Sequence, residues 1–380
     1  MRTLHGDIQV LKVLHIITRL DPGGSSDICV REAEFLREKG CSVFTASGVT
    51  EHTPEGVIPL RFLKREINPV WDTLAVIEIF LLCRRLKPDI LHLHTSKAGM
   101  AGRIAGSLAG VGRIFYQPHG IVFYGYFSRF KSRLILCAER LLARLAEKII
   151  VLTREAGREF LEYRVGKSRQ YAVLENGVDP EIFNEIPPCA RISLRESLGI
   201  EGSEFVFGMA GRLVPLKGHR FFLEAFARLS AEVDSLRGVI IGDGPEIPGL
   251  LSLSGRLGIK EKVLFTGYRK DMDKAVHLMD LLVQPSLVEG FGLTLIEAGA
   301  SGIPAIGFSV GGIKDIIDDG VTGILVKKED TEGLYRAMRS LYFSQERVRE
   351  MGRKARERVC GHFTLEMMRD RLYGIYGIGE

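Results

Sequence analysis

The feature that most constrains the fold is a regular alternation of short apolar runs with longer helix-like segments. In the first half, apolar runs of strand length begin near Val10 and the last one ends at Leu152. The alternation restarts at Phe205 and continues to Val326. Such alternation is typical of parallel sheets covered by helices on both faces. The sequence therefore predicts an α/β protein with two doubly wound domains.

The chain length and the turn signals divide the sequence. A chain of 380 residues is too long for one ordinary core. Turn residues near Asn176 and a Pro-containing polar stretch separate the two alternating halves. We expect an N-terminal domain over residues 1–180, a linker over 181–203, a C-terminal domain over 204–363 and a final segment over 364–380.

The composition is that of a globular protein. Charged residues make up 26% of the chain and the net charge is +5, which suits an anionic ligand or membrane surface better than a nucleic acid. The six cysteines form no C-x-x-C pair, so we expect reduced thiols and no metal site. No signal-peptide core and no apolar window of ~18 residues is present. We predict a cytoplasmic protein, which could still rest on a membrane.

The segment Glu289–Glu297 is the most informative part of the chain. It follows an apolar run and places two carboxylates around two glycines and a helix start. N–H groups at a helix start bind anions, and carboxylates accept hydrogen bonds from hydroxyl groups. The segment thus suits a ligand that carries both phosphate and hydroxyl groups. Three alternatives remain for these acids: a surface turn, ordinary compensation of a helix dipole, and the acid–base pair of a hydrolase.

Two further strand ends carry polar groups. Gly211–Gly218 contains Arg212 and Lys217, two cations that could neutralise a diphosphate, although a merely solvated basic loop is the alternative. The loop is not a P-loop, because the required glycine spacing is absent. His119 follows a strand between a proline and a glycine, which suits a ligand-binding edge; a structural role is the alternative.

Two other segments invite more than one interpretation. Residues Arg129–Lys148 predict a basic amphipathic helix that either rests on anionic lipid or simply packs its apolar stripe on the sheet. Gly23 and Gly24 follow the first strand without the G-x-G-x-x-G pattern, which disfavours binding of a nicotinamide cofactor.

Several short motifs, each weak alone, form a specific set in their order along the chain. They are Asp21-Pro-Gly-Gly24, Thr95-Ser-Lys-Ala-Gly99, His119-Gly120, Asn176-Gly-Val-Asp179, Gly211-Arg-Leu213, Lys217-Gly218, Gly242-Asp-Gly-Pro245 and Glu289 with Glu297. The set resembles the retaining GT-B glycosyltransferases of family 4, nearly from end to end. The segment Thr95–Gly99, His119-Gly120 and the basic helix resemble members that build bacterial surface polysaccharides on lipid carriers.

The resemblance implies two Rossmann-like domains that face each other across a deep cleft, with the final helix crossing back to the first domain. It implies catalytic roles for four residues: His119, Arg212, Lys217 and Glu289. It implies donor-binding roles for twelve more: Gly23, Gly24, Gly211, Gly242, Gly267, Tyr268, Arg269, Gly290, Phe291, Gly292, Leu293 and Glu297. The two cations would hold the diphosphate, Glu289 the donor sugar, Glu297 the ribose, and His119 would lie near the reacting carbon.

The implied activity is hexosyl or N-acetylhexosaminyl transfer, with retention, from a nucleotide sugar to a saccharide or lipid-linked acceptor. UDP is expected because it is frequent in the family, and neither a cofactor nor a metal ion is expected. A nucleotide-sugar epimerase, a glycoside hydrolase and a non-catalytic nucleotide-sugar-binding protein are the alternatives. Leu216 stands where many relatives have an acid, and Ser25-Ser26-Asp27 replaces the usual residues after the glycine pair, which leaves the acceptor contacts open.

Overall fold

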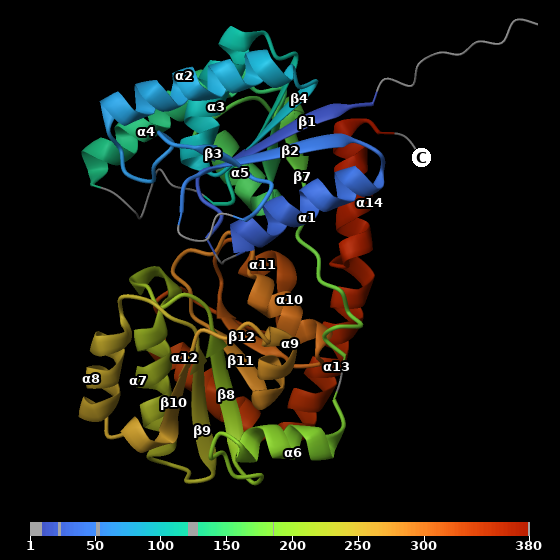
Figure 1. The fold of residues 1–380 in the computed structure, drawn as a ribbon. Coiled ribbons are helices and arrows are strands. Elements are labelled where there is room, and N and C mark those ends of the chain that lie inside the picture. The colour runs from blue at the N-terminus through green and yellow to red at the C-terminus, as the bar shows by residue number, and fades with distance from the viewer. Residues whose placement is uncertain (1–9, 22–23, 51–53, 121–127, 185, 379–380) are drawn as a thin grey trace, which may run out of the picture. The chain divides into compact units, whose positions relative to one another are not determined.

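The computed structural model describes residues 10–21, 24–50, 54–120, 128–184 and 186–378. They form two compact units (Figure 1). Unit 1 comprises Met1–Glu175 and Arg369–Glu380, and unit 2 comprises Asn176–Met368. Each unit contains a parallel sheet with helices on both faces, so the predicted α/β class is confirmed.

Unit 1 is built on a seven-stranded sheet in the order β3-β2-β1-β4-β5-β6-β7. Its strands are β1 (Lys12–Ile17), β2 (Ser42–Gly48), β3 (Ile58–Leu60), β4 (Ile90–His94), β5 (Arg113–Gln117), β6 (Lys148–Val151) and β7 (Tyr171–Val173). All neighbouring strands pair in parallel. The strand order reverses between β1 and β4, which is where open α/β sheets bind ligands.

The two faces of this sheet differ in chemistry. The helices of the unit are α1 (Gly24–Glu38), α2 (Pro69–Leu86), α3 (Ser96–Ala109), α4 (Arg129–Leu142), α5 (Arg154–Glu162) and the end of α14 (Leu365–Tyr376). Because side chains alternate along a strand, Leu91 and Leu93 of β4 pack into the apolar core with α2 and α3. His92 and His94 point to the opposite face, where both lie near Glu32 of α1 and His92 contacts Tyr376 of α14.

Helix α4 is shorter than the sequence predicts. The helix expected over 129–148 ends at Leu142, a short 3-10 turn follows, and Lys148 already belongs to β6. The reason is that strand pairing begins here, with the backbone N–H of Glu147 donating to the carbonyl of Ile114 at 2.8 Å. A buried ion pair, Arg103 Nη2 to Glu139 Oε2 at 2.7 Å, fixes α4 to α3.

Unit 2 is built on a six-stranded sheet in the order β10-β9-β8-β11-β12-β13. Its strands are β8 (Phe205–Ala210), β9 (Leu236–Ile241), β10 (Val263–Gly267), β11 (Leu281–Gln284), β12 (Ala305–Phe308) and β13 (Gly323–Val326). The strand order reverses between β8 and β11. The carboxyl ends of these two central strands therefore define the expected ligand edge of this unit.

Helices cover both faces of the second sheet (Figure 1). The longer ones are α7 (His219–Ser230), α8 (Ile247–Arg256), α10 (Leu293–Ala300), α12 (Thr331–Tyr342) and α13 (Gln345–His362), and the short ones are α9 (Met272–Ala275) and α11 (Ile313–Ile316). Aromatic side chains of Phe207, Phe222 and Phe226 are fully buried between the sheet and α7. In the described ranges, no helix is both long and apolar enough to span a bilayer.

The boundary between the units differs from the predicted one. It falls after Glu175, and the segment 181–203 expected to be a linker belongs to unit 2. It contains a helix, α6 (Pro188–Glu196), because two arginines of that helix bind the chain just before β11. Arg191 Nη2 lies 2.7 Å from Asp280 Oδ1, and Arg195 Nη2 lies 2.9 Å from Asp280 Oδ2.

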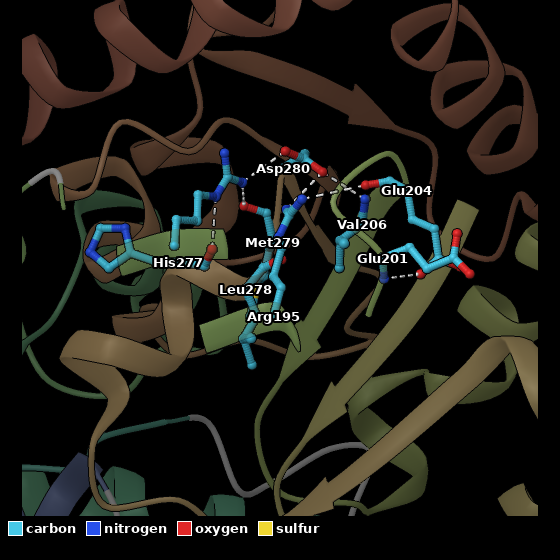
Figure 2. Close-up of polar contacts among 9 residues, drawn as sticks. Arg195, Glu201, Glu204, Val206, His277, Leu278, Met279 and Asp280 are labelled. Carbon is cyan, nitrogen blue, oxygen red and sulfur yellow. Dashed lines mark hydrogen bonds and ion pairs between the residues drawn. The ribbon is translucent and has the colours of Figure 1, made fainter. Parts of the chain in front are cut away.

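Figure 2 shows how Arg195 joins three parts of unit 2. Its side chain also donates to the carbonyl of Leu278 at 3.0 Å, and the same Asp280 oxygen accepts the backbone N–H of Val206 at 2.7 Å. Only 5% of Arg195 is exposed. Desolvation lowers the pKa of the guanidinium, and the nearby Asp280 charge opposes that shift. The ion pair is therefore a buried connection between α6, β8 and β11.

We expect the substitution Arg195→Ala to destabilise unit 2 by about 3 kcal/mol, because Asp280 Oδ2 loses its buried cation and the carboxylate keeps only the more exposed Arg191 as a charged partner. Urea unfolding followed by circular dichroism measures this as a lower midpoint. The matched control is Arg353→Ala, whose side chain pairs with Glu350 on the surface and is 57% exposed. The control should change the stability by no more than about 1 kcal/mol. Equal effects of the two substitutions would contradict the assigned role of Arg195.

Candidate functional site

The loops that follow β8 and β11 are fastened to each other. The backbone N–H of Leu287 donates to the carbonyl of Leu216 at 2.8 Å. Gly218 has a φ of +75°, and a Cβ built there would lie 1.9 Å from the carbonyl oxygen of Pro285. A side chain at this position would force the loops apart, so glycine is required by both conformation and space.

An ion pair joins these two loops at the reversal point of the sheet. Lys217 Nζ lies 2.7 Å from Glu289 Oε2. The same carboxylate oxygen accepts hydrogen bonds from Ser286 Oγ at 3.0 Å and Gln284 Nε2 at 3.2 Å. Glu289 is therefore held in one orientation, while the Lys217 ammonium keeps further N–H donors for a ligand. The predicted residues Lys217 and Glu289 are thus brought together, and Gln284 and Ser286 are supporting residues that the sequence interpretation missed.

Arg212 lies in the same loop as Lys217 and is exposed. Within the part of the chain that the structure describes, no side-chain hydrogen bond or ion pair engages its guanidinium. Its backbone is fixed by the neighbouring loop, because a Cβ on Gly242 would lie 2.0 Å from the carbonyl oxygen of Gly211. The loop after β8 therefore presents one paired and one unpaired cation, a combination that suits a doubly charged phosphate group.

The start of α10 supplies backbone donors beside Glu289. Gly292 caps the helix with a φ of +107°, Leu293 is its first residue, and the buried Phe291 anchors the turn that begins at Gly290. The N–H groups at the start of a helix lack acceptors one turn earlier, so they can bind an anion. Here the N–H of Leu295 already donates to the carbonyl of Gly292 at 2.9 Å, which leaves the preceding N–H groups for a ligand. Glu297 is the fifth residue of the helix and half-buried, within the two turns in which the sequence places it.

A second pair of glycines holds this turn in place. The backbone N–H of Gly312 donates to the carbonyl of Glu289 at 3.1 Å. A Cβ on Gly311 would lie 2.0 Å from the carbonyl oxygen of Glu289. A Cβ on Gly312 would lie 2.4 Å from the carbonyl oxygen of Phe291. The sequence interpretation missed these residues, although a glycine pair in the loop after β12 was the available signal.

The segment after β10 lies farther from this pair. β10 is the edge strand, two strands from β8. The carbonyl of Gly267 accepts the backbone N–H of Gly242 at 2.9 Å, and Tyr268 is 58% exposed. Arg269 is bound to Asp271 through two hydrogen bonds, of 2.9 and 2.5 Å, which lower the pKa of the Asp271 carboxyl. The structure thus places these three residues beside the β9 loop and not beside Lys217 and Glu289.

In unit 1, His119 follows β5 in a conformation rare for a side chain with Cβ, with a φ of +57°. Although part of the residue is accessible, its imidazole is desolvated, which lowers its pKa to about 4. The ring is therefore neutral near pH 7. Of the two predicted glycines, Gly24 is the first residue of α1, and Gly23 lies outside the described residues.

His119 is the outer member of a buried cluster of polar groups. The other members are His15 on β1, Glu32 on α1, His92 and His94 on β4, Gln117 on β5 and Tyr376 on α14, and none of them is more than 1% exposed. Burial lowers the pKa of His15 to about 3 and those of His92 and His94 well below their usual value. Burial also raises the pKa of Glu32 to about 8, opposed by a hydrogen bond from Gln117.

The cluster corrects one premise of the sequence interpretation. We expected no metal site because no ligand cluster is visible along the chain, yet ligand-type atoms of His15, Glu32, His92 and His94 lie within 4.8 Å of one another. Two of those nitrogen atoms are already hydrogen bonded to each other, His15 Nδ1 to His94 Nε2 at 2.9 Å, and their rings stack. Hydrogen bonds therefore satisfy both nitrogens of His15 and His94, whereas Glu32 Oε2, His92 Nε2 and Gln117 Oε1 have no hydrogen-bond partner among the described residues. The alternation in Leu91-His92-Leu93-His94 was the signal for it.

Two family models match the chain in sequence order. The model described as Glycosyltransferase Family 4 matches residues 22–182, and the one described as Glycosyl transferases group 1 matches residues 190–358. The UDP-Gal:alpha-D-GlcNAc-diphosphoundecaprenol alpha-1,3-galactosyltransferase of Escherichia coli is 28% identical over 83% of this chain and 81% of its own length. The N-acetyl-alpha-D-glucosaminyl L-malate synthase of Bacillus anthracis is 36% identical over 48% of each protein.

Solved structures support the same architecture. The crystal structure of Anabaena HepE in complex with UDP matches with a TM-score of 0.82 at 22% identity, covering 97% of this chain and 100% of that one. The structure of WaaG, a glycosyltransferase involved in lipopolysaccharide biosynthesis, matches with a TM-score of 0.79 at 17% identity over 96% and 100% of the two chains. At these identities, the two matches establish a shared fold.

The raised pKa of Glu32 implies that the free energy of unfolding depends on pH. The folded state holds the Glu32 proton more tightly than the unfolded chain does, with a pKa of about 8 in place of 4.5. The stabilisation that this proton provides is complete below the unfolded pKa and is lost as the pH rises through the folded pKa. We therefore expect wild-type protein to lose stability relative to Glu32→Gln between about pH 5 and pH 8, and the difference to be constant above that.

Urea unfolding of both proteins at a series of pH values measures this difference. Glu34→Gln, which removes an exposed carboxylate from the same helix, controls for the general change in charge. A difference between wild type and Glu32→Gln that stays constant over the whole pH range would show that Glu32 does not titrate as described.

Proposed function

Because this chain belongs to the GT-B glycosyltransferases of family 4, we propose that it transfers a sugar from a UDP-sugar, with retention, to a lipid-linked or growing saccharide. The observation that carries the proposal is the Lys217–Glu289 pair at the reversal point of the second sheet. The same loops carry Arg212, whose guanidinium pairs with no other residue that the structure describes, and the N-terminus of α10, the groups that a sugar diphosphate requires.

The donor diphosphate is the leaving group, so negative charge grows on it as the glycosidic bond breaks. Arg212 and Lys217 stabilise that charge more in the transition state than in the ground state, which is how they accelerate the reaction. The N–H groups at the start of α10 add fixed partial positive charge at low reorganisation cost. We expect these groups to supply the charge that a metal ion supplies in other transferases, with no further cofactor.

The two glutamates of the segment Glu289–Glu297 bind hydroxyl groups of the donor. Glu289 is oriented by three donors to a single oxygen, and it accepts hydrogen bonds from the donor sugar. Glu297 lies further along α10 and accepts from the ribose hydroxyl groups. One oxygen of Glu289 already accepts from Lys217, Ser286 and Gln284, so the carboxylate is better suited to hydroxyl recognition than to the proton transfers of a hydrolase acid–base pair.

His119 contacts the donor sugar as a neutral hydrogen-bonding group, consistent with its low pKa. The acceptor hydroxyl attacks the anomeric carbon from the face that the diphosphate leaves. The bond from that carbon to the phosphate oxygen breaks with its electron pair on the diphosphate, and the same oxygen takes the acceptor proton. In this mechanism no side chain forms a covalent bond to the sugar.

The name of one relative supports the proposed donor and acceptor. The Escherichia coli enzyme is named for a UDP-galactose donor and a diphosphoundecaprenol-linked acceptor, and it matches over 83% of this chain. We therefore favour UDP as the donor base and a lipid-linked saccharide as the acceptor. Incubation of the donor alone separates transfer from the epimerase alternative, since only an epimerase changes the donor stereochemistry without an acceptor.

We expect Arg212→Ala and Lys217→Ala each to lower kcat by about 10²- to 10³-fold, because each removes a charge that stabilises the leaving group. The donor for this assay is first selected by thermal shift, since a ligand that binds the folded state raises its unfolding temperature. Release of nucleoside diphosphate in the presence of acceptor then measures the rate.

Arg256→Ala serves as the control, because Arg256 is exposed at the end of α8, away from these loops. It should leave both kcat and the unfolding temperature unchanged. If Arg212→Ala and Lys217→Ala keep the wild-type kcat while the control behaves as expected, the assignment of the leaving-group site is wrong.

A lipid-linked acceptor requires access to a membrane, and α4 offers a surface for it. Its exposed stripe is apolar, with Phe130, Leu134 and Leu141 exposed by 79%, 64% and 62%. These positions follow the helical repeat and therefore share one face. Basic residues flank the stripe: Arg129, Lys131, Arg133, Arg140 and Arg144. We propose that this face rests on anionic lipid.

We expect the double substitution Phe130→Ser with Leu134→Ser to weaken binding to anionic vesicles by roughly tenfold, because it removes the side chains that would enter the interface. Vesicle co-sedimentation measures the binding. Ile77→Ser with Leu81→Ser on α2 is the matched control, with the same spacing and with exposures of 48% and 59%. Equal binding by all three proteins, or no binding by the wild type, would refute a membrane role for α4.

A further inference from the structure

A continuous chain of hydrogen bonds connects His119 to the C-terminal helix. His119 Nε2 lies 3.0 Å from His94 Nδ1, and His94 Nε2 lies 2.9 Å from His15 Nδ1. His15 Nε2 lies 3.4 Å from the hydroxyl of Tyr376, which lies 2.7 Å from His92 Nδ1. Two imidazole rings, those of His94 and His15, thus stand in series between His119, the predicted substrate-binding group, and a phenol on α14.

The protons in such a chain cannot be placed independently. A neutral imidazole carries one N–H donor and one acceptor nitrogen, and each hydrogen bond needs a single proton. If His94 donates to His119, its other nitrogen must accept from His15, and His15 must then accept from Tyr376. If His119 donates to His94, every bond reverses. One choice of direction therefore determines the tautomer of all three rings.

The tautomer of His119 decides what it offers a ligand. Its Nε2 is occupied by His94, so Nδ1 is the nitrogen that remains. In one direction of the chain Nδ1 carries the proton and donates, and in the other it is a bare acceptor. The nitrogen that carries the proton is set by the hydrogen bond of the opposite nitrogen.

We propose that His94, His15 and Tyr376 are positioning residues that set the ring orientation and the tautomer of His119. The inference rests on the proposed role of His119 at the donor sugar. It extends the residues that act on His119 to α14, where Tyr376 lies 361 positions from His15.

Two observations show that the Tyr376 hydroxyl is held in place and not simply accommodated. The ring packs edge-on against Phe115 with centroids 5.1 Å apart, and the backbone carbonyl of Tyr376 accepts from Arg113 Nη1 at 2.8 Å. The residue is 1% exposed, and burial keeps its hydroxyl protonated by raising its pKa well above the usual value. A fixed, protonated phenol is suited to ending a proton-ordered chain.

Tyr376→Phe tests the proposal, because it removes only the hydroxyl and keeps the ring packing. Tyr373→Phe is the matched control: it lies three positions earlier on α14 and loses a hydrogen bond of 2.7 Å to the carbonyl of Phe35, which is outside the chain of histidines. Imidazole ¹⁵N chemical shifts of histidine-labelled protein report which nitrogen of His119 is protonated. The His119 signals are identified by their absence in His119→Gln.

In Tyr376→Phe we expect the two His119 ¹⁵N shifts to move toward each other, as one tautomer becomes a mixture. We expect kcat to fall by about ten- to a hundredfold with a KM for the donor within about twofold, because a misdirected group costs rate more than binding. Tyr373→Phe should change neither the shifts nor kcat. His94→Asn, which keeps a polar group toward His119 but breaks the bond to His15, should reproduce the spectrum of Tyr376→Phe.

Unchanged His119 shifts in both Tyr376→Phe and His94→Asn would overturn the proposal, whatever the activity. Stoichiometric metal in the purified wild-type protein, measured by elemental analysis, would also overturn it, because the histidine nitrogens would then be ligands. Failure of the proposed function gives a different result: His119→Gln would keep the wild-type kcat while the His119 shifts still respond to Tyr376→Phe.

Discussion

The candidate site of unit 2 depends on one constraint, the reversal of strand order between β8 and β11. The helices that follow these two strands cover opposite faces of the sheet, so their connecting loops leave the same edge side by side. Close contact is possible only because Gly218 leaves room for the Pro285 carbonyl. The loops then bring Lys217 and Glu289 to 2.7 Å, and the rest of the site is arranged around that pair.

Unit 1 has a reversal of strand order as well, but one face of its sheet buries a cluster of polar side chains. Its strand order reverses between β1 and β4, where the hydroxyls of Thr18 and Thr95 lie 2.6 Å apart. One face of this sheet is apolar, but the face toward α1 and α14 buries several imidazoles. Burying polar groups is costly unless their donors and acceptors are matched, and a chain of neutral rings matches them in series. This requirement explains how residues near the two ends of the polypeptide, His15 and Tyr376, can influence the tautomer of His119.

Much of this could be predicted from the sequence, for identifiable reasons. Long apolar runs marked the central strands, and polar residues directly after them marked Arg212, Lys217 and Glu289. The edge strands β3 and β7 were missed because three residues are too few to show a period. The helix predicted to reach Lys148 was overextended because Ala143, Leu145 and Ala146 continue its apolar repeat, although a 3-10 turn begins at Ala143 and leads into β6. The supposed linker is a helix because Asp280 binds its arginines.

The sequence by itself determined the class of the protein, two α/β units with charged and glycine-rich loops at strand ends, because strand and helix periods are local properties of the chain. Only the tertiary structure decided which of those loops meet. Lys217 and Glu289 are 72 positions apart, and Tyr376 reaches His15 across 361 positions. The physical reason is that strand order and helix placement arise from pairing and packing between distant segments, which no local pattern records.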